Sequence, residues 1–232
     1  MKPFLTAEWK HLLNVTYRVP PELLIDKVPP GVELDIQDGT AFASVVAFDF
    51  LNTRVRGLTI PFHVNFPEIN LRFYIKHQGK RGVMFWKEFV PKYCIALVAQ
   101  KIYNEPYEAT AMSSRIFSEG GANLLEHTFS YRKKDFRISA RFTDEKTLPP
   151  PDSLAYYFKE HDLGVGVLRS GKSIQYEVKH PEWEVFNLLD YQLDLDFGCL
   201  YGNQWAFLAD ETPYCAILAE GSEVAVYPHQ KI

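Results

Sequence analysis

No segment of this chain is apolar for long. The longest uninterrupted apolar run covers residues 93–99, whereas a membrane-spanning helix needs about 20 such residues in succession. The N-terminal segment MKPFLTAEWKHLL also lacks the apolar core that a secretory signal requires. We therefore expect a protein that makes no membrane contact and resides in the cytoplasm.

Cysteine is scarce, and charge of one sign never accumulates. The three cysteines, Cys94, Cys199 and Cys215, are widely spaced and form no CxxC pair, which favours buried thiols in a reducing compartment over a disulfide framework. The formal net charge is -4, with no block of like charges. That balance gives no electrostatic basis for binding nucleic acid.

Familiar catalytic and metal-binding motifs are also missing. The seven histidines form neither an HExxH motif nor a compact cluster, and the chain contains no GxSxG. We therefore expect no bound metal and no cofactor.

Residues 166–173, GVLRSGKS, match the sequence pattern of a phosphate loop. Its mechanism requires a helix to begin at the Lys-Ser pair, so that backbone amides cradle a phosphate. The following residues, IQYEVK, alternate as a strand does. We interpret the segment as a hairpin turn and not as a nucleotide site.

What the chain does have is aromatic, strand-forming sequence in abundance. Apolar residues make up 47% of the chain and aromatic residues 15%, a composition suited to broad side chains on pleated strands. We expect strands at residues 11–18, 41–50, 69–76, 83–90, 108–117, 124–132 and 136–143. Helices are expected at residues 22–27, from 91 to about 104, and at 152–160 with Asp152 as the N-cap. Turns at Asp38-Gly39, Ser170-Gly171 and Glu220-Gly221 predict hairpins.

These elements predict one domain over residues 1–232, of the α+β class but mainly β, because two or three short helices lie among many antiparallel strands. The clearest strand is 69–76, where apolar and polar residues alternate and predict a half-buried element. Its polar face carries Glu68, Asn70, Arg72 and Tyr74 at steps of about 6.5–7 Å. Such a row could bind a carboxylate inside a cavity, or it could equally be the solvated outer face of a sheet.

Several stretches resemble the DUF2071 (YqjF-like) family, itself similar to a branch of the acetoacetate decarboxylase superfamily. The stretches are AEWKHLLNVTYRVPPELL, LDIQDGTAFASVVAFDF, TRVRGLTIPFHVNFPEINLRFYI and the segment ending in EPY. The resemblance extends most clearly from residue 7 to about residue 112. It implies a large antiparallel sheet, curled into a cone-like barrel around an internal cavity, in an oligomeric protein.

The resemblance also implies where the decarboxylase chemistry would lie. Those enzymes carry two adjacent lysines after a helix and a proline; one forms a Schiff base and the other lowers its pKa. Matching that proline to Pro106 places Tyr107 and Glu108 on the lysine positions, and neither residue can form an imine. The cavity glutamate of the decarboxylases matches Glu68, a basic residue of the first strand matches Lys10, and a second acidic position falls on Ala43.

We therefore predict a small-molecule cavity protein that forms a homo-oligomer, and our first hypothesis is an enzyme acting on keto- or carboxylate-bearing metabolites without Schiff-base chemistry. A binding or sensing module using the same cavity is one alternative, and Schiff-base decarboxylation through Lys101 is another. The candidate catalytic residues are Glu68, Tyr107 and Lys101. The candidate ligand-binding residues are Lys10, Arg54, Asn70, Arg72, Tyr74 and Glu108.

Overall fold

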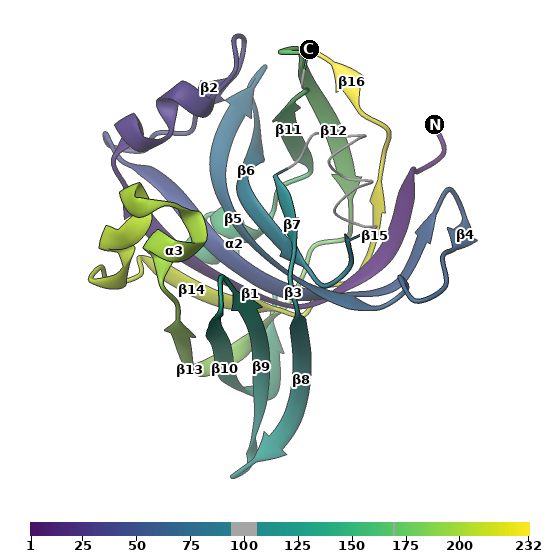
Figure 1. Cartoon of the computed structure of the whole chain (residues 1–232), viewed down its shortest axis with the longest axis vertical. Coiled ribbons are helices and arrows are strands. Elements are labelled where there is room, and N and C mark those ends of the chain that lie inside the picture. The colour runs from purple at the N-terminus through teal and green to yellow at the C-terminus, as the bar shows by residue number, and fades with distance from the viewer. Residues whose placement is uncertain (94–105, 169) are drawn as a thin grey trace.

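The fold is organised around a closed barrel. The computed structural model describes residues 1–93, 106–168 and 170–232. Within them seven strands pair in a ring, in the order β1-β3-β5-β6-β11-β12-β15 and back to β1 (Figure 1). Their bounds are β1 (Leu5–Val19), β3 (Ala41–Val55), β5 (Phe66–His77), β6 (Lys80–Val90), β11 (Leu163–Val167), β12 (Ser173–Lys179) and β15 (Glu223–Val226).

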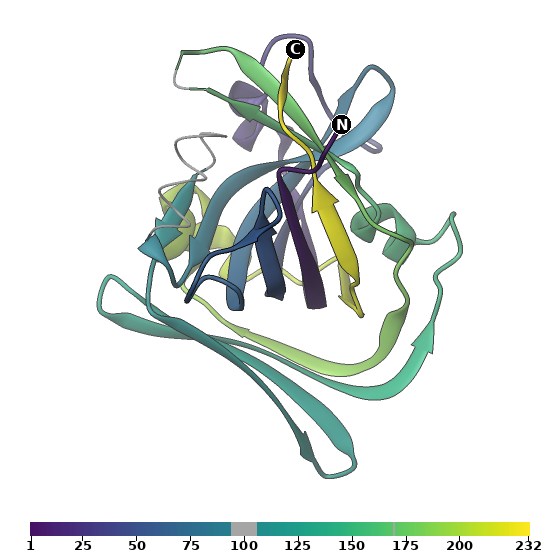
Figure 2. The same cartoon turned by 90° about the vertical axis from the view of Figure 1, so that its right-hand side faces the viewer.

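A second group of strands branches from β1 and continues the same sheet. It runs through β14 (Cys215–Ala219), β13 (Val185–Asp194), β10 (Lys134–Thr147), β9 (Ala122–Tyr131) and β8 (Met112–Glu119). In Figure 2 the strands of this branch form a curved layer beneath the barrel. The mainly-β prediction with a barrel-like antiparallel sheet is therefore confirmed.

Short elements complete the described chain. The strands β2 (Glu33–Leu34), β4 (Leu58–Thr59), β7 (Tyr107–Ala109) and β16 (Gln230–Lys231) extend the edges of β5, β3, β6 and β12. The helices are α2 (Leu154–Lys159) and α3 (Phe197–Tyr201), with 3₁₀ turns η1 (Pro21–Leu23), η2 (Ile25–Lys27) and η3 (Asn203–Ala209). The expected helix from residue 91 to about 104 lies almost wholly outside the described residues.

The barrel wall separates the large apolar core outside the barrel from the cavity inside it. On β5 the side chains of Ile69, Leu71 and Phe73 belong to the large apolar core, to which residues of the branch strands also belong. The alternate side chains, among them Glu68 and Asn70, are buried on the inner face of the barrel. The prediction of a half-buried strand was therefore wrong, because barrel closure and the branch sheet cover β5 on both faces.

Two predicted hairpins were wrong because the pairing is not local. The Asp38-Gly39 turn does form, with mutual hydrogen bonds between Gln37 and Thr40, but β2 before it pairs with β5 and not with β3. The strands on either side of Glu220-Gly221, β14 and β15, both pair with the same edge of β1. This second segment is thus an irregularity along one edge and not a chain reversal.

Smaller differences concern helix ends. Residues 22–27 lie in two 3₁₀ turns in place of one helix. The N-cap of α2 is Ser153, whose Oγ accepts from the Tyr156 amide, and not Asp152. The hairpin at Ser170-Gly171 is confirmed by the pairing of β11 with β12, and a strand stands where a phosphate loop needs a helix.

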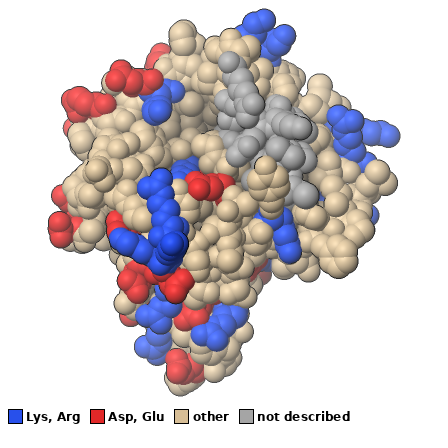
Figure 3. Space-filling view, in the orientation of Figure 1, with Lys and Arg blue, Asp and Glu red and all other residues tan. Residues whose placement is uncertain are grey.

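Two surface properties bear on partners. No helix among the described residues is long and apolar enough to cross a membrane. On the face drawn in Figure 3, acidic and basic side chains are interleaved.

Gly221 provides a test of the β1 edge. It adopts φ +78°, and a Cβ added there would lie 2.0 Å from the Trp9 carbonyl oxygen. The neighbouring amides of Trp9 and His11 donate to the carbonyls of Ser222 and Glu220, so the backbone cannot move away without breaking the edge. We expect Gly221→Ala to lower the free energy of unfolding in urea by about 3 kcal/mol or more.

Gly39→Ala is the matched control. Gly39 has the same φ of +78° but open space around it, so it should lose only about 1 kcal/mol, the ordinary cost of a left-handed alanine. Equal losses in the two variants would show that the close approach to Trp9 does not matter.

Candidate functional site

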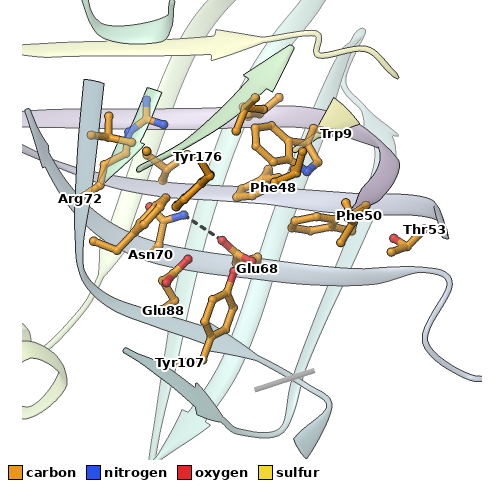
Figure 4. Close-up of a pocket in the computed structure, with 18 of the residues that line it drawn as sticks. Trp9, Phe48, Phe50, Thr53, Glu68, Asn70, Arg72, Glu88, Tyr107 and Tyr176 are labelled. Atoms are coloured by element: carbon orange, nitrogen blue, oxygen red, sulfur yellow. Dashed lines mark hydrogen bonds between the residues drawn. The ribbon is translucent and has the colours of Figure 1, made fainter. Parts of the chain in front are cut away.

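The inside of the barrel contains a cavity of about 220 Å³. Its wall is polar towards one end, where Arg72, Asn70 and Glu68 lie, and apolar towards the other, where Phe50 and Thr53 lie (Figure 4). The strand register sets this order, because Glu68 lies opposite Phe48 and Phe66 lies opposite Phe50 across β5 and β3. Alternation along β5 and β3 therefore places a polar row and an aromatic row in one cavity.

Glu68 lies at the junction of the two regions. Only 2% of the residue is exposed. The Asn70 amide donates to its Oε1 at 3.0 Å, and the Tyr107 hydroxyl donates to its Oε2 at 2.9 Å (Figure 4). Both carboxylate oxygens therefore have a partner from the cavity wall.

Burial decides the protonation of this carboxyl group. Desolvation raises the pKa of Glu68 to about 7, and the hydrogen bonds from Asn70 and Tyr107 oppose the rise only in part. Burial, followed by the nearby carboxylates of Glu68 and Glu88, raises the pKa of Tyr107 well above its ordinary value. At neutral pH Tyr107 is therefore a phenol that donates, while Glu68 can either hold or release a proton.

Two residues that line the cavity near Glu68, Glu88 and Tyr176, were not among the predicted site residues. Glu88 lies opposite Asn70 in the β5–β6 register and is only 1% exposed. Tyr176 reaches the cavity from β12, and its ring covers Gly164: a Cβ on that glycine would lie 2.2 Å from the ring carbon Cζ. An acidic residue within the apolar strand 83–90 was the available signal for Glu88, whereas no sequence signal places Tyr176 beside Tyr107.

At the polar end of the cavity, several buried hydrogen-bonding atoms have no partner among the described residues. Arg72 Nη2 donates to the Phe158 carbonyl at 3.0 Å, but Arg72 Nε, Asn70 Oδ1 and both ring nitrogens of His161 are buried and have no partner among the described residues. Burial, then the Arg72 and Arg81 charges, lowers the pKa of His161 well below its ordinary value, so its ring is neutral. These atoms form a donor and acceptor set suited to a polar ligand.

Comparison with known proteins identifies the family. Residues 6–223 match the model of DUF2071, described as an uncharacterized conserved protein. The chain belongs to the DUF2071 family. A relative in it, the uncharacterized protein YqjF of Bacillus subtilis (strain 168), is 31% identical over 189 residues, which cover 77% of this chain and 74% of YqjF.

Solved structures show that the fold of this DUF2071 protein is that of acetoacetate decarboxylase-like enzymes. The enduracididine biosynthesis enzyme MppR, complexed with pyruvate, superposes with a TM-score of 0.71 at 14% identity, covering 100% of this chain and 91% of its own. Acetoacetate decarboxylase from Legionella pneumophila gives 0.69 at 10% identity, with coverages of 100% and 88%. An acetoacetate decarboxylase-like enzyme from Sphingomonas wittichii RW1 gives 0.66 at 14%, with coverages of 100% and 94%.

The structure separates the predicted site residues into two groups. Glu68, Asn70, Arg72 and Tyr107 line one cavity. Tyr74 shares their face of β5 but lies beyond the cavity, where its hydroxyl is 2.5 Å from the Ser44 Oγ and its ring packs on Phe158 of α2.

The other described candidates do not line the cavity. Glu108 pairs with Lys87 at 2.7 Å. Arg54 is exposed between the two cavity residues Thr53 and Val55, and Lys10 is adjacent to the cavity residue Trp9 without lining the cavity itself. Lys101 lies outside the described residues. None of the described residues that line the cavity is a lysine.

The raised pKa of Glu68 makes stability depend on pH. The unfolded chain releases this proton near the ordinary value of 4.5, whereas the folded chain keeps it up to about 7. The contribution of the protonated group is fully present below pH 4.5 and is lost as the pH rises through about 7. We expect Glu68→Gln, which cannot ionise, to gain stability relative to the parent protein by about 2.5 kcal/mol between about pH 5 and pH 8, measured by urea unfolding.

Glu33→Gln serves as the control, since Glu33 is exposed on β2. Its stability difference from the parent should not vary with pH. A pH-independent difference for Glu68→Gln as well would mean that Glu68 ionises normally in the folded protein.

Proposed function

We propose that this protein is an enzyme that transfers a proton on a small keto- or carboxylate-bearing compound held in the barrel cavity, without forming an imine. The observation that carries the proposal is the buried carboxyl of Glu68, whose pKa is about 7 and whose two oxygens are held by Asn70 and Tyr107. A general acid or base is most effective when its pKa lies near the working pH. Burying such a group in a cavity costs stability, which favours a catalytic role over a structural one.

The reaction would begin with removal of a proton next to a carbonyl. The ionised Glu68 accepts that proton, so that an O–H bond forms on the carboxyl as the C–H bond breaks. The electron pair moves onto the carbonyl oxygen as an enolate. Return of the proton from Glu68 to the same carbon, or to the enolate oxygen to give the enol, completes a balanced transfer that needs no oxidant, reductant or metal.

Arg72 supports the binding of an anionic or developing negative oxygen. Its guanidinium carries a fixed positive charge, and its Nε has no partner among the described residues. The ring of His161 is neutral, and neither of its nitrogens has a hydrogen-bond partner among the described residues, so it can add an N–H donor. Donors already in place before the reaction stabilise a growing charge without having to reorganise.

Imine chemistry has no support in the described part of the cavity. Tyr107 and Glu108 occupy the positions that the resemblance assigns to the lysine pair. The ammonium group of Lys87, which is near them in the fold, is bonded to Glu108, Tyr131 and the Leu200 carbonyl. Borohydride treatment with acetoacetate should therefore leave the protein mass unchanged, and a covalent increment on Lys101 would contradict this part of the proposal.

The proton transfer can be tested without knowing the natural substrate. In D₂O, the protein should exchange the α-protons of small 2-oxo acids for deuterium faster than buffer alone, as followed by proton NMR. We expect Glu68→Gln to slow this exchange by about 10²- to 10⁴-fold, the usual contribution of a general base. The rate should rise with pH through a midpoint near 7, where the catalytic carboxylate forms.

Glu33→Gln is again the control and should exchange at the parental rate. If 2-oxo acids bind to the parent protein but exchange no faster than in buffer, the cavity is a binding or sensing site and not a catalytic one.

Two expectations from the sequence stay part of the proposal. Cys199 and Cys215 are free thiols, which supports a reducing, cytoplasmic location. Assembly into a homo-oligomer is proposed from the family resemblance.

A further inference from the structure

Beyond Glu68 the cavity continues as a mainly apolar arm, called the apolar arm below, formed by Trp9, Phe48, Phe50, Thr53, Val55, Ile60 and Phe66. Its buried polar atoms without a partner among the described residues are the Trp9 indole nitrogen and the Thr53 hydroxyl oxygen. In Figure 4 this arm extends from Glu68 towards Thr53, away from Arg72. The pairing of Glu68 with Phe48, and of Phe66 with Phe50, places the change from polar to aromatic wall at Glu68 itself. A molecule whose polar head meets Glu68 and Arg72 therefore has an apolar channel on one side of that head.

The rings of the arm support one another. Phe50 stacks on Phe66 with centroids 4.7 Å apart, and Trp9 meets Phe48 and Phe50 edge-on at 5.3 and 5.6 Å. These side chains come from three neighbouring strands of a closed barrel, and Trp9 also contacts Trp183 behind it. Such a packed aromatic wall cannot collapse onto a ligand that lacks a tail.

A small polar ligand leaves the apolar arm empty and gains no affinity from it. A ligand with an apolar tail fills the arm and binds more tightly. Each methylene group moved from water into an apolar site tightens binding about fourfold, since it contributes roughly 0.8 kcal/mol. Aromatic tails gain further from edge-to-face contacts with the surrounding rings. The shape of the arm thus selects ligands by their apolar end, independently of the chemistry at Glu68.

We infer that the substrate is an oxo acid with a hydrophobic, preferably aromatic, tail: the carboxylate and carbonyl lie at Arg72, Asn70 and Tyr107, and the tail lies along the apolar arm. The identity of the polar head rests on the proposed function. The tail follows from the arm alone. Pyruvate and acetoacetate would then be poor ligands because they leave the arm empty.

A graded series of 2-oxo acids tests the inference by titration calorimetry. The probes are pyruvate, 2-oxohexanoate and 2-oxo-4-phenylbutanoate, which share a head and differ in their tails. We expect affinity to rise in that order, with the phenyl compound binding at least about 100-fold more tightly than pyruvate. Equal affinity across the series would overturn the inference.

Thr53→Phe locates the tail. Thr53 is buried at the far end of the arm, so a phenylalanine there shortens the space that the tail would occupy. The variant should bind 2-oxo-4-phenylbutanoate at least about tenfold more weakly and pyruvate within twofold of the parent. The matched control is Thr59→Phe, the same substitution at an exposed position of β4, which should change neither affinity.

Val55→Phe is a second variant, nearer the surface, for use if Thr53→Phe does not fold. Val55 lines the arm and is only partly buried, so it should weaken long-tailed ligands in the same selective way. A uniform loss of affinity for all three probes in either folded variant would contradict a tail in the arm.

The outcomes separate this inference from the proposed function. Tight, tail-dependent binding without deuterium exchange would support the arm and refute proton transfer. Exchange on pyruvate with no gain from a tail would support proton transfer and refute the arm.

Discussion

The closed barrel imposes one constraint on which the rest of the site depends: the inward-facing side chains of Phe66, Glu68 and Asn70 on β5 are removed from water. For apolar residues that burial stabilises the fold, but for Glu68 it penalises the charged form. The hydrogen bonds from Tyr107 and Asn70 offset only part of this penalty, so the pKa of Glu68 settles near neutrality. A chain selected for stability alone would place an apolar residue at this position.

The same barrel is compatible with different chemistries because the wall residues can change while the strands remain. Acetoacetate decarboxylase-like enzymes share the fold at 10–14% identity. In this DUF2071 chain Tyr107 follows the proline that the resemblance matches to their motif, and its phenol donates to Glu68. The architecture is therefore retained, whereas the described cavity wall presents carboxylates, phenols and an arginine where imine chemistry would need an amine.

Much of the architecture could be predicted from local patterns. Alternation in strand 69–76 predicts the strand and places Glu68, Asn70 and Arg72 on one face, but it does not say whether that face meets water or a cavity. The answer depends on β11, β12 and β15, which close the barrel from the far end of the sequence. The two wrong hairpins have the same cause, since a turn motif reports local geometry and not which strand lies alongside.

Three cavity-lining residues that the sequence did not predict are also brought together only when the barrel closes. Glu88, His161 and Tyr176 come from three separate segments and carry no shared motif. Arg54, Lys10 and Glu108 have suitable chemistry but stand outside the cavity lining. A one-residue step along a strand reverses the direction of a side chain, which is why residue type alone could not separate the two groups.

The titration of Glu68 inside the cavity can be measured on its carboxyl group directly. Protein labelled with ¹³C at the glutamate side-chain carboxyl carbon would be titrated by NMR, and Glu68→Gln would assign the resonance. We expect a midpoint near pH 7 for the resonance lost in that variant. A midpoint near 4.5, the ordinary value for glutamate, would contradict this expectation.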